Sequence, residues 1–137
     1  MKLLLMLGLL SWTGWLGAHP SDYFHAEASK DSTNQLRDQT DTLELRFLVW
    51  GCECPNWIAV TDYEKAEISG GMIDYCMYLE SGNQELKLPA DFDPETQRIR
   101  VVGRFYEKTA YPAERLPSEE TVRKARIFRV STVEIYN

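Results

Sequence analysis

The chain has 137 residues, of which 44% are hydrophobic and 26% are charged, with a formal net charge of −6. This composition is that of one globular domain. It excludes a disordered polymer, a collagen-like repeat and a protein with several membrane spans. Three cysteines are too few for a small scaffold held together by disulfides.

The first 18 residues have the pattern of a secretory signal peptide. Lys2 precedes an apolar run over residues 3–10, and small residues follow up to Ala18. The apolar run is shorter than the ~20 residues that a membrane-spanning helix needs. We therefore expect cleavage after Ala18, export to the periplasm or the extracellular space, and no transmembrane span in the mature chain.

Residues 19–41 are polar and lack a regular period, so they predict a flexible N-terminal linker before a single domain at residues 42–137. Charge is uneven along the domain. Residues 98–129 hold nine bases and four acids, whereas residues 45–97 hold three bases and ten acids. The acidic total disfavours nucleic-acid binding, and the basic segment suits a small anion or a protein partner.

Alternating hydrophobicity then predicts a β-rich domain with five strands. The predicted strands are residues 42–50, 57–60, 72–80, 98–106 and 125–135. We expect a tight connection at residues 69–71 and a bulge near Ser131. Residues 88–97 predict a loop with at most one helical turn, and Ser118 predicts the N-cap of a short helix that ends near Lys124.

One face of each long strand is expected to be buried. The residues on these faces are Leu43, Leu45, Phe47 and Val49 in the first strand, Ile73, Tyr75, Met77 and Leu79 in the third, and Ile99, Val101, Gly103 and Phe105 in the fourth. Five such strands suit a small closed barrel, and a two-sheet sandwich is the alternative.

The last two predicted strands resemble the end of an OB-fold domain. The resemblance is in Arg98–Phe105, with its valines before Gly103, and in Arg126–Ile135, with its spaced hydrophobic residues. It implies an all-β, five-stranded Greek-key barrel over roughly residues 42–136. OB-fold domains bind ligands on one strand face and on two loops. By resemblance, these loops are residues 50–57 and 107–124.

Aromatic and basic side chains predict a ligand-binding face on this barrel. The candidate residues are Trp50, Trp57, Tyr75, Tyr78, Arg98, Arg100, Arg104 and Tyr106. Such faces stack rings and bind anions. The alternative is a solvated sheet face, on which the arginines form ion pairs with Glu44, Asp74 and Glu80.

Cys52 and Cys54 lie two residues apart between two tryptophans, and Cys76 follows on the third predicted strand. One of the pair could form a disulfide with Cys76, or all three could be buried thiols. A third possibility is a Cu(I) or Zn(II) site, with Met72 or Met77 as an additional ligand. A redox-active Cys52–Cys54 disulfide is a further alternative.

No combination of residues predicts catalysis. Both histidines, His19 and His25, lie in the predicted linker, and no phosphate-binding glycine loop is present in the sequence. We therefore expect an exported, non-catalytic binding or accessory module without a cofactor. The alternatives are a soft-metal carrier that uses the three cysteines and a nuclease-like OB-fold enzyme.

Overall fold

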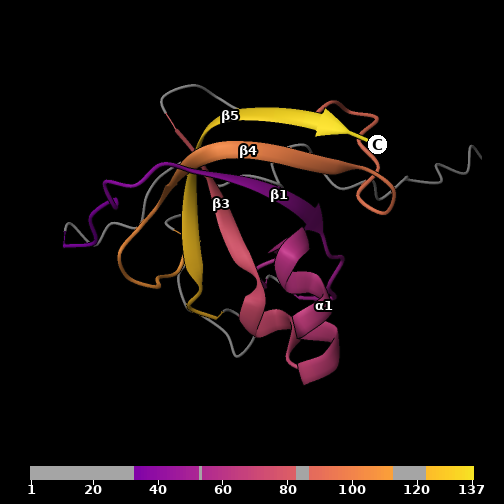
Figure 1. The fold of residues 1–137 in the computed structure, drawn as a ribbon, viewed down its shortest axis with the longest axis horizontal. Helices are drawn as coiled ribbons and strands as arrows, with labels where there is room; N and C mark the ends of the chain where they lie inside the picture. The colour runs from indigo at the N-terminus through magenta and orange to yellow at the C-terminus, as the bar shows by residue number, and fades with distance from the viewer. Residues whose placement is uncertain (1–32, 53, 83–86, 113–122) are drawn as a thin grey trace, which may run out of the picture.

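The computed structural model describes residues 33–52, 54–82, 87–112 and 123–137. Its elements are β1 (Asp41–Phe47), β2 (Trp57–Ala59), α1 (Val60–Ser69), the 3-10 helix η2 (Met72–Tyr75), β3 (Met77–Ser81), β4 (Arg98–Phe105) and β5 (Arg126–Tyr136). The five strands form a closed barrel in the order β1-β2-β3-β5-β4 (Figure 1). The predicted all-β, OB-like barrel is therefore confirmed, and its predicted signal peptide lies outside the described residues.

Strand β5 closes the barrel by pairing with two partners. It runs parallel to β3 and antiparallel to β4, and all other pairs are antiparallel. Opposite β4, the register shifts because Val102 pairs with Thr132 whereas Gly103 pairs with Val130. Ser131 is thus the extra residue of a β-bulge, as predicted, and a bulge lets a strand bend from one neighbour to the next.

The barrel interior is built by the alternation of side chains along the strands. In β4, Ile99, Val101, Gly103 and Phe105 are buried, as predicted for that face. Residues from the other strands complete this core: Leu45, Trp57, Ala59, Met77, Leu79, Phe128 and Val130. The outward-facing positions of β4, which carry arginines, remain exposed and define the surface on which a site can form.

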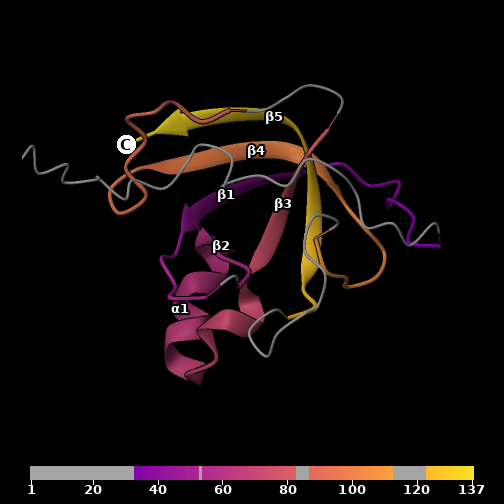
Figure 2. The ribbon, with the colours of Figure 1, turned by 180° about the vertical axis from the view of Figure 1, so that it is seen from behind.

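The region between β2 and β3 differs from the prediction. It contains α1, which lies at one end of the barrel (Figures 1 and 2). The helix ends at Gly70, whose φ of 72° only glycine adopts readily. The predicted third strand was too long, because its first residues form η2 instead. Four residues with alternating hydrophobicity fit one helical turn as well as a short strand. The local sequence pattern therefore could not distinguish η2 from the start of a strand.

The predicted face of the third strand is therefore only half correct. Met77 and Leu79 point into the barrel core, whereas Tyr75 packs in a second cluster beneath α1. The predicted first strand was also too long. Observed β1 ends at Phe47, and Val49 is 69% exposed rather than buried.

The described end of the predicted linker, residues 33–40, is docked on the barrel. The Arg37 amide donates to the Phe105 carbonyl at 2.8 Å, and Leu36 forms a β-bridge with Tyr106. The Asn34 side chain exchanges hydrogen bonds with the backbone of Lys108. These residues are thus not a free linker, because their backbone groups extend the edge of the barrel. Residues 19–32 and most of the predicted helix at 118–124 lie outside the described residues.

Candidate functional site

The structure separates the residues of the predicted basic–aromatic face. Trp57 is fully buried in the barrel core. Tyr78 and Tyr106 are buried in a cluster outside the barrel, together with Ala125 and Ile127. Trp50 and Tyr75 pack in the cluster beneath α1. Arg98, Arg100 and Arg104 remain exposed along β4. The eight residues therefore do not form one surface, and the aromatic members serve mainly to pack the fold.

The middle of β4 matches the alternative of a solvated sheet face. Arg100 lies between Glu44 on β1 and Glu134 on β5 in the strand register. Its guanidinium is 2.7 Å from the Glu44 carboxylate and 3.6 Å from that of Glu134. The hydrogen bond from Arg100 lowers the pKa of Glu44. Arg100 is thus already compensated by two carboxylates, which leaves little reason for it to bind an anion.

The end of β4 has the opposite arrangement of charge. Arg104 lies directly opposite Arg129 on β5, and Arg129 lies directly opposite Glu80 on β3. We name this row of Glu80, Arg129 and Arg104 the arginine rung. Residues directly opposite each other share a face of the sheet, so the two guanidinium groups are neighbours. The rung carries two positive charges and one negative charge.

Glu80 anchors the inner end of the arginine rung. Its side chain is 2% exposed. The Tyr106 hydroxyl donates to Glu80 Oε1 at 3.0 Å, and Arg129 Nε lies 3.8 Å from the same oxygen. Burial raises the pKa of Tyr106, and the nearby carboxylate raises it further, so this hydroxyl remains a donor at neutral pH. Arg129 is therefore held in place by Glu80 on the neighbouring strand β3. Arg104 forms no ion pair within the described ranges.

A cleft of about 360 Å³ opens over the two arginines of the rung. Its walls come from the docked N-terminal segment, the end of β3 and the bulged part of β5. They consist of Leu36, Thr40, Gly82, Gly103, Arg104, Arg129, Val130 and Ser131. This volume is at the lower end of the range of about 300–1,000 Å³ for small-molecule sites. The cleft therefore suits a small ligand with negative charge.

Two glycines allow the strands around this cleft to approach closely. A Cβ on Gly103 would overlap the carbonyl oxygen of Arg129, and one on Gly82 would lie 2.7 Å from that of Val130. The bulge residue Ser131 donates its hydroxyl to the Val102 carbonyl at 2.8 Å. Because the glycines have no side chains, backbone rather than side chains forms this part of the cleft wall.

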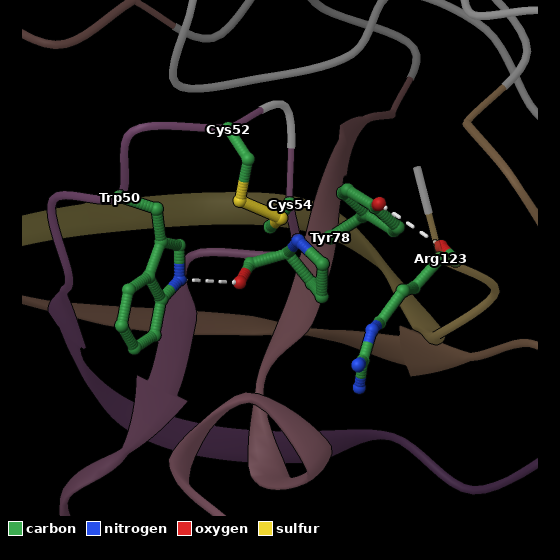
Figure 3. Close-up of a disulfide and its surroundings, with 6 residues drawn as sticks. Trp50, Cys52, Cys54, Tyr78 and Arg123 are labelled. Atoms are coloured by element: carbon green, nitrogen blue, oxygen red, sulfur yellow. Dashed lines mark hydrogen bonds between the residues drawn. A yellow bond between two sulfur atoms is a disulfide. The ribbon is translucent and has the colours of Figure 1, made fainter. Parts of the chain in front are cut away.

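The cysteines form a different pair from the leading prediction. Cys52 and Cys54 are bonded to each other, with their Cα atoms 5.3 Å apart (Figure 3). Cys76 is a buried free thiol. The predicted bridge from Cys76 to one of the pair is therefore wrong. Cys76 packs against α1 from the end of η2, while the other two lie in the β1–β2 loop. Burial raises the pKa of the Cys76 thiol to about 12.

The disulfide contributes little to the stability of the fold. It closes a loop of only three residues. Loop-entropy arithmetic assigns such a bond about 1.6 kcal/mol, against about 3 kcal/mol for a 15-residue loop. The β1–β2 loop is also held by other bonds, because the Trp50 indole donates to the Pro55 carbonyl at 2.9 Å (Figure 3).

The predicted metal site would need all three thiolates. Two of the sulfurs are bonded to each other here, so the Cu(I) or Zn(II) carrier stays a prediction for the reduced chain. Met77 lies in the barrel core and Met72 beneath α1. Within the described ranges, no three His, Cys, Asp or Glu side chains are arranged to hold a metal ion. In the same part of the chain, no helix is both long and apolar enough to cross a membrane.

Sequence reasoning found Arg104 and named Glu80 among the ion-pair partners of the arginines, but it missed Arg129. Arg129 lies between Phe128 and Val130 in a predicted strand, and Glu80 ends another. Their alignment with Arg104 depends on the bulge and on the parallel β3–β5 pairing. A useful signal was a charged residue directly beside apolar core residues in each of the three strands.

Searches with the whole chain found no matching protein-family model, no matching curated protein and no matching solved structure.

Proposed function

We propose that this protein is an exported, non-catalytic binding module for a small anion, which it holds in the cleft over the arginine rung. The observation that carries this proposal is the direct cross-strand pairing of Arg104 with Arg129, which places two positively charged side chains next to each other at the cleft. Like charges directly opposite each other destabilise a sheet. A bound anion would relieve that repulsion.

The chemistry of the rung favours a carboxylate or a phosphate. Guanidinium groups present planar pairs of donors that match these anions. Arg129 is positioned by Glu80, so little conformational freedom is lost when it binds. Thr40 adds a hydroxyl group to the same cleft. Export itself rests on the sequence pattern of residues 1–18.

Isothermal titration calorimetry with inorganic phosphate and citrate tests the proposal. We expect one site per chain, and a loss of affinity of at least about tenfold in Arg104→Ala, since a hydrogen bond to a charged group is removed. Arg98→Ala is the matched control, because Arg98 is an exposed arginine of the same strand that does not line the cleft. Equal affinity in Arg104→Ala and wild type, or no binding of either anion at millimolar concentration, would contradict the proposal.

A further inference from the structure

The β1–β2 loop keeps its shape through contacts other than the disulfide. At its base, the Leu48 amide donates to the Asn56 carbonyl at 2.7 Å. Higher in the loop, the Trp50 indole donates to the Pro55 carbonyl (Figure 3). Pro55 itself is fully buried. Since the bond between Cys52 and Cys54 constrains only three residues, it can open without loss of the surrounding fold.

The two cysteines of the disulfide differ in exposure. Cys54 is only 6% exposed, whereas Cys52 is partly exposed. A Cβ added to Gly51, which precedes Cys52, would meet no atom within 4 Å beyond its chain neighbours, so there is open space at Gly51. The nearby Val49 is exposed to solvent. Thiol–disulfide exchange needs access to one sulfur only, and Cys52 is the more exposed cysteine of the pair.

A positively charged cleft begins at Pro55, the residue that follows Cys54 in the chain. It has a volume of about 180 Å³ and extends from Pro55 to residues 123–126. Three of its lining residues, Arg123, Lys124 and Arg126, are cationic, and one, Asp74, is anionic. Arg123 is 3.3 Å from the Asp74 carboxylate. Arg126 lies 3.9 Å from the Asp62 carboxylate. Three cations and two carboxylates therefore leave this cleft with a net positive charge.

The wall of this cleft is held in place by the barrel. The Tyr78 hydroxyl donates to the Arg123 carbonyl at 3.0 Å, so the Arg123 side chain is not needed for this contact (Figure 3). Arg126 donates to the Tyr75 carbonyl at 3.0 Å. Cys76 also lines the cleft, but its raised pKa keeps it protonated and thus out of thiolate chemistry.

We propose that the Cys52–Cys54 disulfide oxidises two thiols of an acidic polypeptide segment that docks at this positive cleft. A thiolate of the partner attacks Cys52 Sγ, the bond to Cys54 breaks, and Cys54 leaves as a thiolate that takes a proton from water. The second partner thiolate then attacks the partner's own sulfur in the mixed disulfide, and Cys52 leaves as a thiolate. Two electrons pass from the partner, which gains a disulfide, to Cys52 and Cys54.

An acidic partner is favoured over a neutral one by charge complementarity with Arg123, Lys124 and Arg126. The exposed Val49 adds an apolar contact that a small dithiol would not use. This activity is independent of anion binding at the arginine rung, because none of its residues line that cleft.

The test uses the oxidised mature protein and a reduced synthetic peptide with two cysteines among aspartates. A second peptide has lysines in place of the aspartates, and dithiothreitol is the small-dithiol arm. After acid quenching and alkylation, mass spectrometry should show that Cys52 and Cys54 are modified and that the peptide is oxidised one to one. We expect the aspartate peptide to react about tenfold faster than the lysine peptide at low salt. Equal rates for all three thiol sources would overturn the role of the cleft.

A second set of experiments identifies the sulfur that is attacked and tests whether the cationic residues of the cleft affect the rate. A peptide with a single cysteine should form a mixed disulfide that maps to Cys52, because it cannot complete the second step. Arg123→Ala should slow the aspartate peptide, whereas Arg98→Ala should not, and Cys76→Ala should leave the reaction unchanged. These three rates are compared on protein that circular dichroism shows to be folded.

The fold must also survive reduction of the bond. We expect the reduced wild-type protein to remain folded, with a thermal midpoint only a few degrees lower. A disulfide that resists the peptide until the protein is denatured, or a protein that unfolds once reduced, would show that the bond is structural and overturn the proposal.

Discussion

Arg100 and Arg104 lie four residues apart on β4 and project from the same outer face, yet their surroundings are opposite in charge. Arg100 has a glutamate on each neighbouring strand, Glu44 and Glu134. Arg104 instead has another arginine, Arg129, directly opposite. The comparison teaches that the strand register, and not the residue type, decides whether an arginine on this face is compensated or is ready to bind an anion.

The β-bulge in β5 is the physical cause of this difference. On the C-terminal side of the bulge in β5, Glu134 pairs with Arg100 in a regular register. Had that register continued, Arg104 would have faced Val130. Because Ser131 is an extra residue, β5 is displaced by one position, and Arg129 comes to lie opposite Arg104. One inserted residue thus changes the charge of the surface.

The largest change in the free energy of unfolding should come from removing the contact between Arg129 and Glu80 in the arginine rung. Arg129→Met leaves the buried Glu80 carboxylate without its cation, which we expect to cost about 3 kcal/mol of unfolding free energy. Urea unfolding measures this difference. Glu80→Gln in the same background should restore most of the loss, since the buried charge is gone. Purely additive effects of the two substitutions would mean that they do not interact.

Removing Arg104 and removing Arg100 should change the free energy of unfolding by smaller amounts and in opposite directions. Arg104→Ala removes a like charge beside Arg129, so without an anion it should stabilise the protein by about 0.5 kcal/mol. Arg100→Ala removes the partner of Glu44 and should destabilise it slightly. Both are measured by urea unfolding at low ionic strength, and added salt should reduce both differences. The same sign for both variants would refute the comparison.

The smallest effect concerns the titration of Glu44. The hydrogen bond from Arg100 lowers its pKa from 4.5 in the folded protein. The pair therefore stabilises the fold above the ordinary pKa, and this contribution is lost as the pH falls through the lowered value. An NMR titration of the Glu44 carboxyl should show a midpoint that rises toward 4.5 in Arg100→Ala. In Arg104→Ala the midpoint should stay where it is in the wild type.

Much of the barrel could be predicted from the sequence because alternation along a strand reports directly on burial. The inner face of β4 and the bulge at Ser131 were both correct. Alternation failed where the segment was short: residues 72–75 fit a strand as well as a helical turn. The helix α1 was missed because only one of its residues, Ala66, is buried, so it lacks a clear apolar stripe.

The sequence by itself determined the β-rich class with its alternating strands, the basic character of residues 98–129 and the proximity of Cys52 to Cys54, since each depends on residues close in the chain. Only the tertiary structure decided which cysteines are bonded, that Trp57 belongs to the core, and that Arg104 meets Arg129 rather than a carboxylate. These outcomes depend on how distant strands align. That alignment is set by barrel closure and by one bulge, neither of which a local pattern can specify.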